Sequence, residues 1–301
     1  MSPTLRAVRS DDEVHAVGGP PLPIGQRIPL RGRGTTFVRE VAGPPGAPTI
    51  LLLHGWIASG GLNWFTAFDA LGADYRVLAL DQRGHGRGIR TRKRFTLADC
   101  ADDAAVLIEQ LDIGPVIAVG YSLGGPVAQL LWRRHPDLVD GLVLCATSHH
   151  LMPGFREQMI FGSVMAAAAG SSRLGYLAAR APIKRMRQWL PRTTPARPET
   201  MREWAGAEMR RHDPRHLLEA GWAMSSYHAK WIDKVDVPTA VLVTTKDKAV
   251  NPFAQLAMAL RIPEASIHRI EDGHVVCSKP SFAPALSAAV ADVVARAYPP
   301  Q

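Results

Sequence analysis

The stretch Gly120-Tyr121-Ser122-Leu123-Gly124 places a hydroxyl nucleophile between two glycines. An apolar run of strand length, residues 115–119, precedes it, and residues 125–132, whose apolar side chains have helical spacing, follow it. Glycines at these positions allow a tight, strained turn on which a serine hydroxyl stands clear of the backbone. The stretch is therefore predicted to be a nucleophile elbow, with Ser122 as the nucleophile.

A serine hydroxyl is a poor nucleophile at neutral pH, so it needs a general base, which in turn needs an acid to orient it. In parallel sheets, such groups gather in loops beyond the carboxyl ends of the strands. His274 lies in such a loop after the strand predicted at residues 266–270, and Asp247 follows the strand predicted at residues 239–244. The alternative role for Asp247 is that of a helix cap or a turn residue. The other loop that is placed to supply the acid, residues 146–148, contains no carboxylate. The predicted triad is Ser122, Asp247 and His274.

An oxyanion that develops during acyl transfer needs hydrogen-bond donors, and two backbone N–H groups are placed to supply them. Leu123 follows the serine within the elbow. Trp56 belongs to the run His54-Gly55-Trp56 after the strand predicted at residues 49–53, and its glycine permits a close approach. We predict that the N–H groups of Leu123 and Trp56 form the oxyanion hole.

Three further side chains are candidates for the substrate pocket. Tyr121 precedes the nucleophile, and it either lines the pocket or packs beneath the elbow. His149 and His150 lie shortly after another predicted strand, and they either line the pocket or belong to a solvated linker. The glycine-flanked residues 81–86 contribute no group that the reaction needs, so they are predicted to form a structural turn.

Apolar runs of strand length alternate with helical patterns over much of the chain. Strands are predicted at residues 35–41, 49–53, 76–80, 115–119, 141–145, 239–244 and 266–270. Besides the helix after the elbow, helices are predicted at residues 63–71, 97–111, 253–260 and 281–298. Because most strand runs are continuously apolar, both faces of the sheet must be covered. The pattern predicts an α/β fold with a mostly parallel central sheet flanked by helices.

The alternation stops between residues 147 and 235, where no strand-like run occurs and prolines separate helical pieces. This segment is predicted to be an inserted, all-helical cap. Its tryptophans and methionines suggest either an apolar, adaptable acyl pocket or the core of the cap itself. The hydrolytic core is then predicted to comprise residues 26–146 and 236–301, and residues 1–25 are predicted to be a mobile tail.

The 301 residues are 47% hydrophobic and 21% charged, which is ordinary for a globular protein. Residues 1–15 contain no apolar run, so we predict no secretory signal and a cytoplasmic location. The three cysteines are far apart and form neither a CxxC motif nor a metal-ligand pattern. They are therefore predicted to be reduced thiols, and neither a metal nor a cofactor is expected.

The net charge of +8 is unevenly placed, because the surplus of lysine and arginine lies mostly between residues 153 and 234. No helix-turn-helix or zinc-finger pattern accompanies it, so nucleic acid is not an expected partner. A basic, tryptophan-containing helical segment fits peripheral contact with an anionic membrane surface, or else a solvated basic face. Within this segment, Lys184, Arg185 and Arg187 are the tightest basic cluster. The sequence leaves the oligomeric state open.

These motifs together resemble the α/β-hydrolase superfamily, in particular its serine branch with a His-Gly-x oxyanion loop and a helical cap. The resemblance covers about residues 30–298, and it rests on His54-Gly55-Trp56, residues 81–86, residues 120–125, the Asp247 loop and Gly273-His274. It implies serine-dependent hydrolysis of an acyl compound, but no particular substrate. Epoxide hydrolases and haloalkane dehalogenases of this fold carry aspartate at the position of Ser122, so the resemblance disfavours both.

The predicted function is hydrolysis of a carboxylic ester, with an apolar or lipid-like small-molecule acyl substrate, through an acyl-enzyme. The same residues leave open a C–C bond hydrolase, a thioesterase and a cofactor-free perhydrolase. A non-enzymatic alternative is an inert ligand-binding protein of this fold. Such scaffolds usually show a broken triad, whereas every element is present here.

Overall fold

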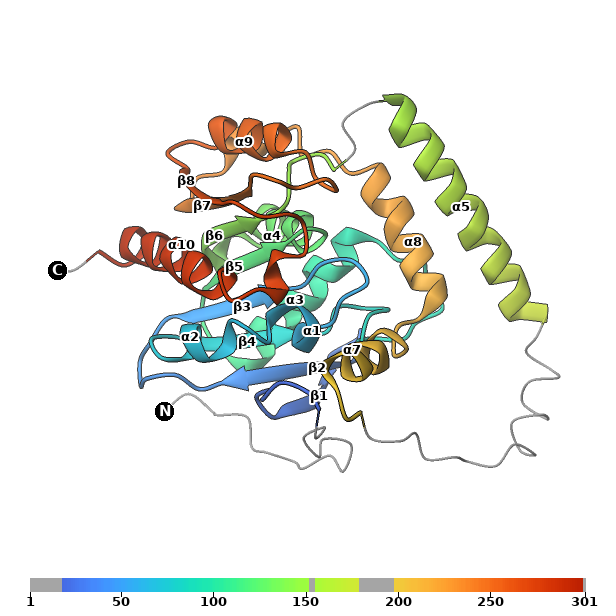
Figure 1. Cartoon of the computed structure of the whole chain (residues 1–301), viewed down its shortest axis with the longest axis horizontal. Helices are drawn as coiled ribbons and strands as arrows, with labels where there is room; N and C mark the ends of the chain where they lie inside the picture. Colours follow the sequence, from blue (N-terminus) through green and yellow to red (C-terminus); the bar gives the residue numbers. More distant parts are fainter. Residues whose placement is uncertain (1–17, 152–154, 179–197, 300–301) are drawn as a thin grey trace.

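The computed structural model describes residues 18–151, 155–178 and 198–299. Its strands are β1 (Gly25–Leu30), β2 (Gly34–Val41), β3 (Thr49–Leu53), β4 (Arg76–Leu80), β5 (Val116–Tyr121), β6 (Val139–Cys145), β7 (Thr239–Thr244) and β8 (Ser266–Ile270). They form one sheet in the order β1-β2-β4-β3-β5-β6-β7-β8 (Figure 1). β2 pairs antiparallel with β1 and β4, and all other neighbours pair in parallel. The predicted mostly parallel sheet is confirmed.

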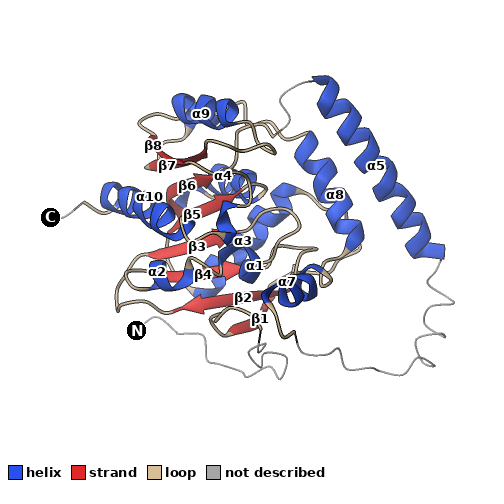
Figure 2. Cartoon of the chain, in the orientation of Figure 1, coloured by secondary structure: helices blue, strands red, loops and turns tan. Residues whose placement is uncertain are grey.

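Helices cover both faces of this sheet (Figure 2). One face carries α3 (Leu97–Leu111), α4 (Gly124–Arg134) and α9 (Pro252–Arg261), and the other carries α1 (Gly60–Trp64), α2 (Phe68–Gly72) and α10 (Phe282–Ala297). Successive strand residues point to opposite faces. In β3, Leu51 and Leu53 join the first face, whereas Ile50 and Leu52 join the second, and all four are fully buried. The strand runs are therefore continuously apolar because helices cover both faces of the sheet, as the sequence pattern predicted.

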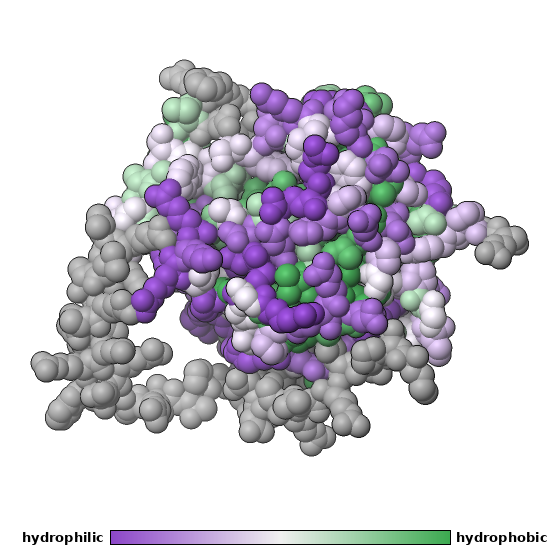
Figure 3. All heavy atoms as spheres, turned by 180° about the vertical axis from the view of Figure 1, so that it is seen from behind, coloured by the Kyte–Doolittle hydropathy of each residue, from purple (hydrophilic) through white to green (hydrophobic). Residues whose placement is uncertain are grey.

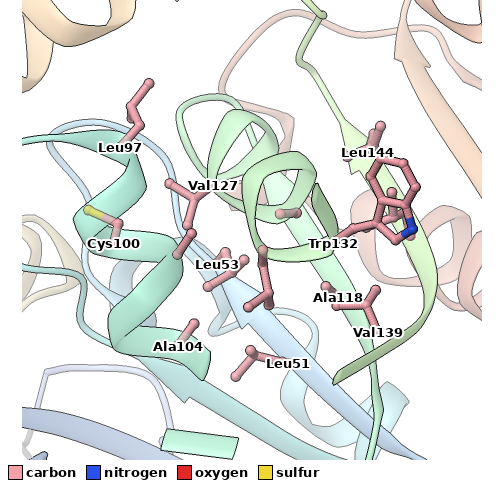
Figure 4. Packing of buried hydrophobic residues seen from close by; sticks show 14 of the residues in the cluster. Leu51, Leu53, Leu97, Cys100, Ala104, Ala118, Val127, Trp132, Val139 and Leu144 are labelled. Carbon is pink, nitrogen blue, oxygen red and sulfur yellow. The ribbon is translucent and has the colours of Figure 1, made fainter. Parts of the chain in front are cut away.

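The first face shows how the helices pack on the strands. Ala104 of α3 and Val127 of α4 lie on the same side of the sheet as Leu51 and Leu53 of β3 (Figure 4). Burial of such aliphatic side chains contributes about 25 cal/mol for each Å² of apolar surface removed from water. This packing fixes α4, and with it the turn between β5 and α4, relative to the sheet.

The single helix predicted at residues 63–71 is wrong, because the structure has two short helices there. α1 follows Ser59, whose Oγ accepts a hydrogen bond from the Leu62 N–H, and α1 ends at Trp64. α2 begins at Phe68. Trp64 and Phe68 are both buried, so the apolar spacing continues across the break and hides it from periodicity.

The segment between β6 and β7 carries α5 (Phe155–Ala178), α7 (Met201–Met209) and α8 (Pro214–Ser225). Within the described part of this segment, the β-structure is limited to an isolated bridge between His150 and His228. α5 lies along α8 at one side of the molecule (Figure 1).

Residues 81–86 form a turn after β4 that contacts the stretch between α7 and α8. The Asp213 N–H donates to the Gly84 carbonyl at 2.8 Å, and the Gly86 N–H donates to His212 Nδ1 at 2.8 Å. The turn therefore anchors this part of the inserted segment to the loops at the carboxyl end of β4.

Several sequence predictions fall on residues outside the described ranges. They include residues 1–17 of the predicted tail and the basic cluster of Lys184, Arg185 and Arg187, so the proposed membrane contact stays a prediction. Across the described ranges, no helix has both the length and the apolar character needed to cross a membrane. The view opposite to Figure 1 shows mostly hydrophilic residues with hydrophobic patches between them (Figure 3).

All three cysteines lie in the described part of the chain. Cys100, Cys145 and Cys277 are buried, and none of them forms a disulfide. Burial raises the pKa of Cys277 to about 11, so this thiol stays protonated at neutral pH.

Candidate active site

Ser122 lies in the sharp turn between the end of β5 and the start of α4. Its φ of +51° is in the left-handed region, which costs a non-glycine residue about 1–3 kcal/mol. Two contacts with the end of β6 hold the turn: the Ser122 N–H donates to the Cys145 carbonyl at 2.9 Å, and Thr147 Oγ1 donates to the Ser122 carbonyl at 2.8 Å. The strand, turn and helix expected around the nucleophile are all present.

The two glycines of the elbow have no room for a side chain. A Cβ on Gly120 would lie 2.4 Å from the Gly124 carbonyl oxygen, and a Cβ on Gly124 would lie 2.0 Å from the Leu53 carbonyl oxygen. Both obstacles are backbone atoms, which cannot turn aside as a flexible side chain can. The glycines therefore let the elbow pack directly against the end of β3.

Gly124→Ala is expected to lower the free energy of unfolding by about 1–3 kcal/mol or more, because the new methyl group overlaps backbone atoms. Gly170→Ala is the matched control, because a Cβ at Gly170, within α5, would have no atom of the described residues within 4 Å. Urea denaturation of both variants checks the prediction. Equal stability of the two would contradict the close packing described for the elbow.

His274 connects the predicted acid to the predicted nucleophile. Its Nδ1 lies 2.8 Å from Asp247 Oδ2, and its Nε2 lies 2.9 Å from Ser122 Oγ. The three residues come from the loops after β5, β7 and β8, which all open at the same edge of the sheet. With Asp247 ionised, Nδ1 carries the ring proton and donates a hydrogen bond to the carboxylate. The lone pair of Nε2 then faces the serine hydroxyl.

The surroundings of Asp247 fix its orientation and its charge. Oδ1 accepts hydrogen bonds from the N–H groups of Ala249 at 2.8 Å and Val250 at 2.9 Å, and Oδ2 accepts one from Thr244 Oγ1 at 2.8 Å. Burial opposes ionisation, but the hydrogen bonds from His274, Val250 and Thr244 outweigh it. The pKa of Asp247 therefore lies below its ordinary value.

Two residues of this arrangement escaped the sequence reasoning. Gln255 of α9 is fully buried, and its Nε2 donates to the Val250 carbonyl at 2.8 Å and lies 3.3 Å from Asp247 Oδ2. Thr147 holds the Ser122 carbonyl. In the sequence, Gln255 is a single polar residue among apolar neighbours of a predicted helix. That pattern does not show whether the side chain is buried, so it could not mark Gln255 as part of the site.

Tyr121 lies beneath the elbow and is only 3% exposed. Its ring contacts those of Trp64 and Phe282 edge-on, and its hydroxyl donates to the His274 carbonyl oxygen. Burial raises the pKa of this hydroxyl above its ordinary value, so it remains a donor. Of the two roles considered for Tyr121, packing has the structural support, and the bond to His274 adds a positioning role.

The predicted oxyanion donors lie on either side of the nucleophile. A Cβ on Gly55 would be 3.4 Å from the Ser122 Cβ, which places the Trp56 loop against the serine. Across residues 18–151, 155–178 and 198–299, neither the Trp56 N–H nor the Leu123 N–H donates to a protein acceptor. Both N–H groups are thus available to an oxyanion.

The Trp56 side chain connects the loop after β3 to the inserted helices. Its Nε1 donates to the Leu217 carbonyl of α8 at 2.9 Å, and its ring meets that of Phe161 of α5 edge-on, with 6.3 Å between centroids. A Cβ on Gly221 of α8 would lie 3.2 Å from the same indole. α5 and α8 therefore lie next to the loop that presents the Trp56 N–H.

His54, the first residue of this loop, is fully buried. Its Nε2 accepts a hydrogen bond from the Gln82 N–H at 2.9 Å, and its Nδ1 donates to the Gly55 carbonyl at 2.8 Å. The bond that Nε2 accepts needs an unprotonated nitrogen, so the two bonds together require the neutral ring with its proton on Nδ1. Burial lowers the pKa of His54 from 6.5 to about 4.

The His54 environment makes stability depend on pH. Between pH 6.5 and 4 the unfolded chain binds a proton here that the folded chain excludes, so this contribution is complete above pH 6.5 and is lost as the pH falls. The expected loss is about 2 kcal/mol between pH 7 and pH 5. Urea denaturation at both pH values measures this loss. Between pH 7 and pH 5, the free energy of unfolding should fall by about 2 kcal/mol less in His54→Gln than in wild type. If the free energy of unfolding depended on pH equally in wild type and variant, the lowered pKa of His54 would be contradicted.

His149 and His150 lie next to each other in the loop after β6. His149 is 4% exposed, and its Nε2 lies 3.1 Å from His150 Nδ1, while His228 completes the group. In the described part of the chain, neither of the two forms a hydrogen bond or a ring contact with Ser122, Asp247 or His274. Their proposed role in a substrate pocket stays a prediction.

The chain is similar in sequence to known hydrolases. The family described as the alpha/beta hydrolase fold matches residues 48–164. A poly(3-hydroxyalkanoate) depolymerase from Ectopseudomonas oleovorans is 28% identical over 235 residues, which cover 77% of this chain and 80% of that protein. Epoxide hydrolase B from Mycobacterium tuberculosis is 34% identical over 119 residues, which cover 38% of this chain and only 33% of that protein.

Solved structures agree with the fold. An esterase from Exiguobacterium antarcticum superposes with a TM-score of 0.71 at 18% identity and covers 89% of this chain and 100% of its own. An enol-lactonase from Burkholderia xenovorans gives a TM-score of 0.66 at 20% identity, covering 89% of this chain and 99% of its own. The sheet order, the family match over residues 48–164 and these superpositions agree, so the chain has the α/β-hydrolase fold and is similar in sequence to hydrolytic enzymes of that superfamily.

Proposed function

We propose that the protein hydrolyses a carboxylic ester through an acyl-enzyme on Ser122. The observation that carries this proposal is the unbroken pair of hydrogen bonds from Asp247 through His274 to Ser122, at 2.8 and 2.9 Å. A serine with this orientation has both a base within proton-transfer distance and an acid that fixes the tautomer of the base.

In the first step, Ser122 Oγ attacks the carbonyl carbon of the ester, and its proton passes to His274 Nε2. The electron pair of the C=O bond moves to the carbonyl oxygen. The N–H groups of Trp56 and Leu123 donate to this oxyanion, and the N-terminus of α4 favours its negative charge. Asp247, ionised at neutral pH, stabilises the imidazolium that forms.

In the second step, the bond between the carbonyl carbon and the alcohol oxygen breaks as the C=O bond re-forms. The His274 imidazolium gives its proton to the departing oxygen, and the acyl group stays on Ser122. A water molecule then attacks the acyl-enzyme and loses a proton to His274, which returns it to Ser122 Oγ as the carboxylic acid leaves.

The acyl pocket is proposed to lie beneath the inserted segment, residues 147–235, acting as a cap. The support comes from Trp56, which is adjacent to the nucleophile and also touches α5 and α8. Phe161 and Met165 of α5 face this region: Phe161 meets the Trp56 ring, and a Cβ on Gly221 would lie 3.0 Å from the Met165 sulfur. Aromatic and thioether side chains suit an apolar acyl chain.

The depolymerase relative makes hydroxyalkanoate esters one candidate among apolar acyl substrates. Its match spans most of both chains, so it bears on the hydrolytic core and on part of the segment between β6 and β7. The epoxide hydrolase relative matches only a third of its own length, and serine at position 122 would form an acyl rather than an alkyl ester.

A substrate panel tests the proposal. Purified protein is assayed with p-nitrophenyl esters of increasing chain length, a 3-hydroxyalkanoate ester, an acyl-CoA thioester and a vinylogous diketone. We expect the highest kcat/KM among the esters, with chains longer than acetate preferred. A preference for the thioester or for C–C cleavage would replace the ester assignment. No turnover at all, without labelling by a fluorophosphonate, would indicate an inert scaffold.

A further inference from the structure

Three histidines meet at the two ends of the inserted segment. His149 and His150 follow β6, whereas His228 follows α8. One ring nitrogen from each lies within 4.8 Å of the other two. We call them the three-histidine cluster. In the described part of the chain it forms no hydrogen bond or ring contact with Ser122, Asp247 or His274, and the proposed ester hydrolysis gives it no role.

Backbone contacts hold the cluster together. His150 and His228 form an antiparallel bridge, and the Ala229 N–H donates to the His149 carbonyl at 2.8 Å. The segment thus leaves the core and returns to it at the same point. The rings are brought together by the chain path itself, rather than by a chance approach of long side chains.

The spacing suits metal ligation. His149 Nε2 and His150 Nδ1 are 3.1 Å apart, and two imidazole nitrogens at about 2.0–2.1 Å from one tetrahedral ion lie about 3.4 Å apart. His228 is exposed, so its ring can turn to shorten the remaining distances. Three imidazoles leave one coordination position open for water.

The neighbours of His149 select the tautomer that a metal requires. Ser148 Oγ donates to the Ala254 carbonyl at 3.0 Å, so its lone pairs can accept the His149 Nδ1–H at 3.5 Å. The lone pair of His149 Nε2 then points toward His150. Metal-binding histidines commonly donate their second ring N–H in this way.

A guanidinium competes for the same lone pair. Arg261 Nη1 lies 3.3 Å from His149 Nε2, and Arg261 Nη2 donates to the Lys230 carbonyl at 3.0 Å. An incoming cation must displace this positive group. Asp233 Oδ1, 3.9 Å from Arg261 Nη2, offers a partner once the arginine has moved. The arginine should therefore weaken metal binding without preventing it.

We propose that His149, His150 and His228 bind one divalent transition-metal ion that ties together the two ends of the inserted segment. Neutral imidazoles favour Zn²⁺, Ni²⁺ and Cu²⁺ over the hard cations Mg²⁺ and Ca²⁺. Zn²⁺ is the best match, because it has no geometric preference of its own and accepts an imperfect tetrahedron. The proposal does not depend on the catalytic assignment.

The first experiment is a titration of the full chain with ZnCl₂ by calorimetry, after tag removal and dialysis against a chelator. A parallel titration with CoCl₂ follows the visible absorption, whose intensity reports four-coordinate Co²⁺. We expect one ion per chain, and the same stoichiometry in Ser122→Ala. Retained binding in that variant separates this site from the proposed active site.

The variants decide which residues bind the ion. His228→Ala should weaken binding at least about 100-fold, because loss of a ligand should exceed the 10- to 100-fold cost of altering a ligand's own partner. His135→Ala is the matched control, since His135 is half-buried and contacts Asp102 away from the cluster, and it should bind as wild type does. Arg261→Gln should tighten binding about tenfold, because it removes the competing cation.

A stability measurement gives a second readout. Zn²⁺ at about 100 times its dissociation constant should raise the thermal unfolding midpoint of wild type by several degrees, and leave that of His228→Ala unchanged. The proposal is overturned if wild type binds more weakly than about 1 mM. It is also overturned if His228→Ala binds as tightly as wild type, or if binding appears only in Arg261→Gln.

Discussion

Replacing Ser122 with alanine is expected to lower kcat for ester hydrolysis by about a millionfold. The variant lacks the oxygen that forms the acyl-enzyme, so only binding and oxyanion stabilisation remain. The fold should be retained, because the turn is held by the Ser122 N–H and carbonyl, which alanine keeps. Hydrolysis of a p-nitrophenyl ester, together with a thermal melt, measures both expectations.

The control for this variant is Ser171→Ala on α5. Ser171 is exposed, and its hydroxyl donates only to the Ala167 carbonyl of the same helix, so its loss should leave kcat within about twofold of wild type. If folded Ser122→Ala kept more than a small fraction of wild-type kcat, Ser122 could not be the nucleophile.

Asp247→Asn is expected to lower kcat by about ten-thousandfold, by a route that the structure specifies. Oδ1 of Asp247 accepts two backbone N–H bonds, so an asparagine will keep its carbonyl oxygen there. Its NH₂ group then faces His274 Nδ1, where the carboxylate had accepted a hydrogen bond. His274 must turn to the tautomer that carries its proton on Nε2, and it can no longer accept the proton of Ser122.

The matched control is Asp233→Asn, because Asp233 forms only exposed ion pairs with Lys234 and Arg261. It should leave kcat near the wild-type value. Steady-state kinetics and circular dichroism of both variants complete the test. Should Asp247→Asn retain more than about a tenth of the activity, another acid must orient His274.

Much of the sheet was predictable because its strands are buried on both faces. Three of the predicted strands, at residues 49–53, 76–80 and 239–244, are buried along almost their whole length and have the bounds of β3, β4 and β7. The strand predicted at residues 266–270 has the bounds of β8, which is a half-exposed edge strand. Continuous apolar runs mark buried strands clearly, and loops beyond their carboxyl ends gather catalytic groups. This is why a serine, an aspartate and a histidine far apart in the chain could be grouped from the sequence alone.

The remaining features depend on contacts that periodicity does not encode. The break between α1 and α2 follows the Ser59 cap, while the apolar spacing continues across it. His149 and His150 gain a shared partner in His228 only because the inserted segment returns to its starting point. Similarly, Gln255 lies next to Asp247 because α9 packs against the sheet. The helical pattern of α9 does not show which residue Gln255 will face.

The most direct test of the central claim is reaction with a fluorophosphonate, followed by peptide mapping. A triad at Ser122 predicts one covalent adduct on the peptide that contains Ser122. It also predicts no adduct in Ser122→Ala and a strongly reduced labelling rate in Asp247→Asn, with Asp233→Asn as the unaffected control. An adduct on another residue, or no adduct on the folded wild-type protein, would contradict the proposed mechanism.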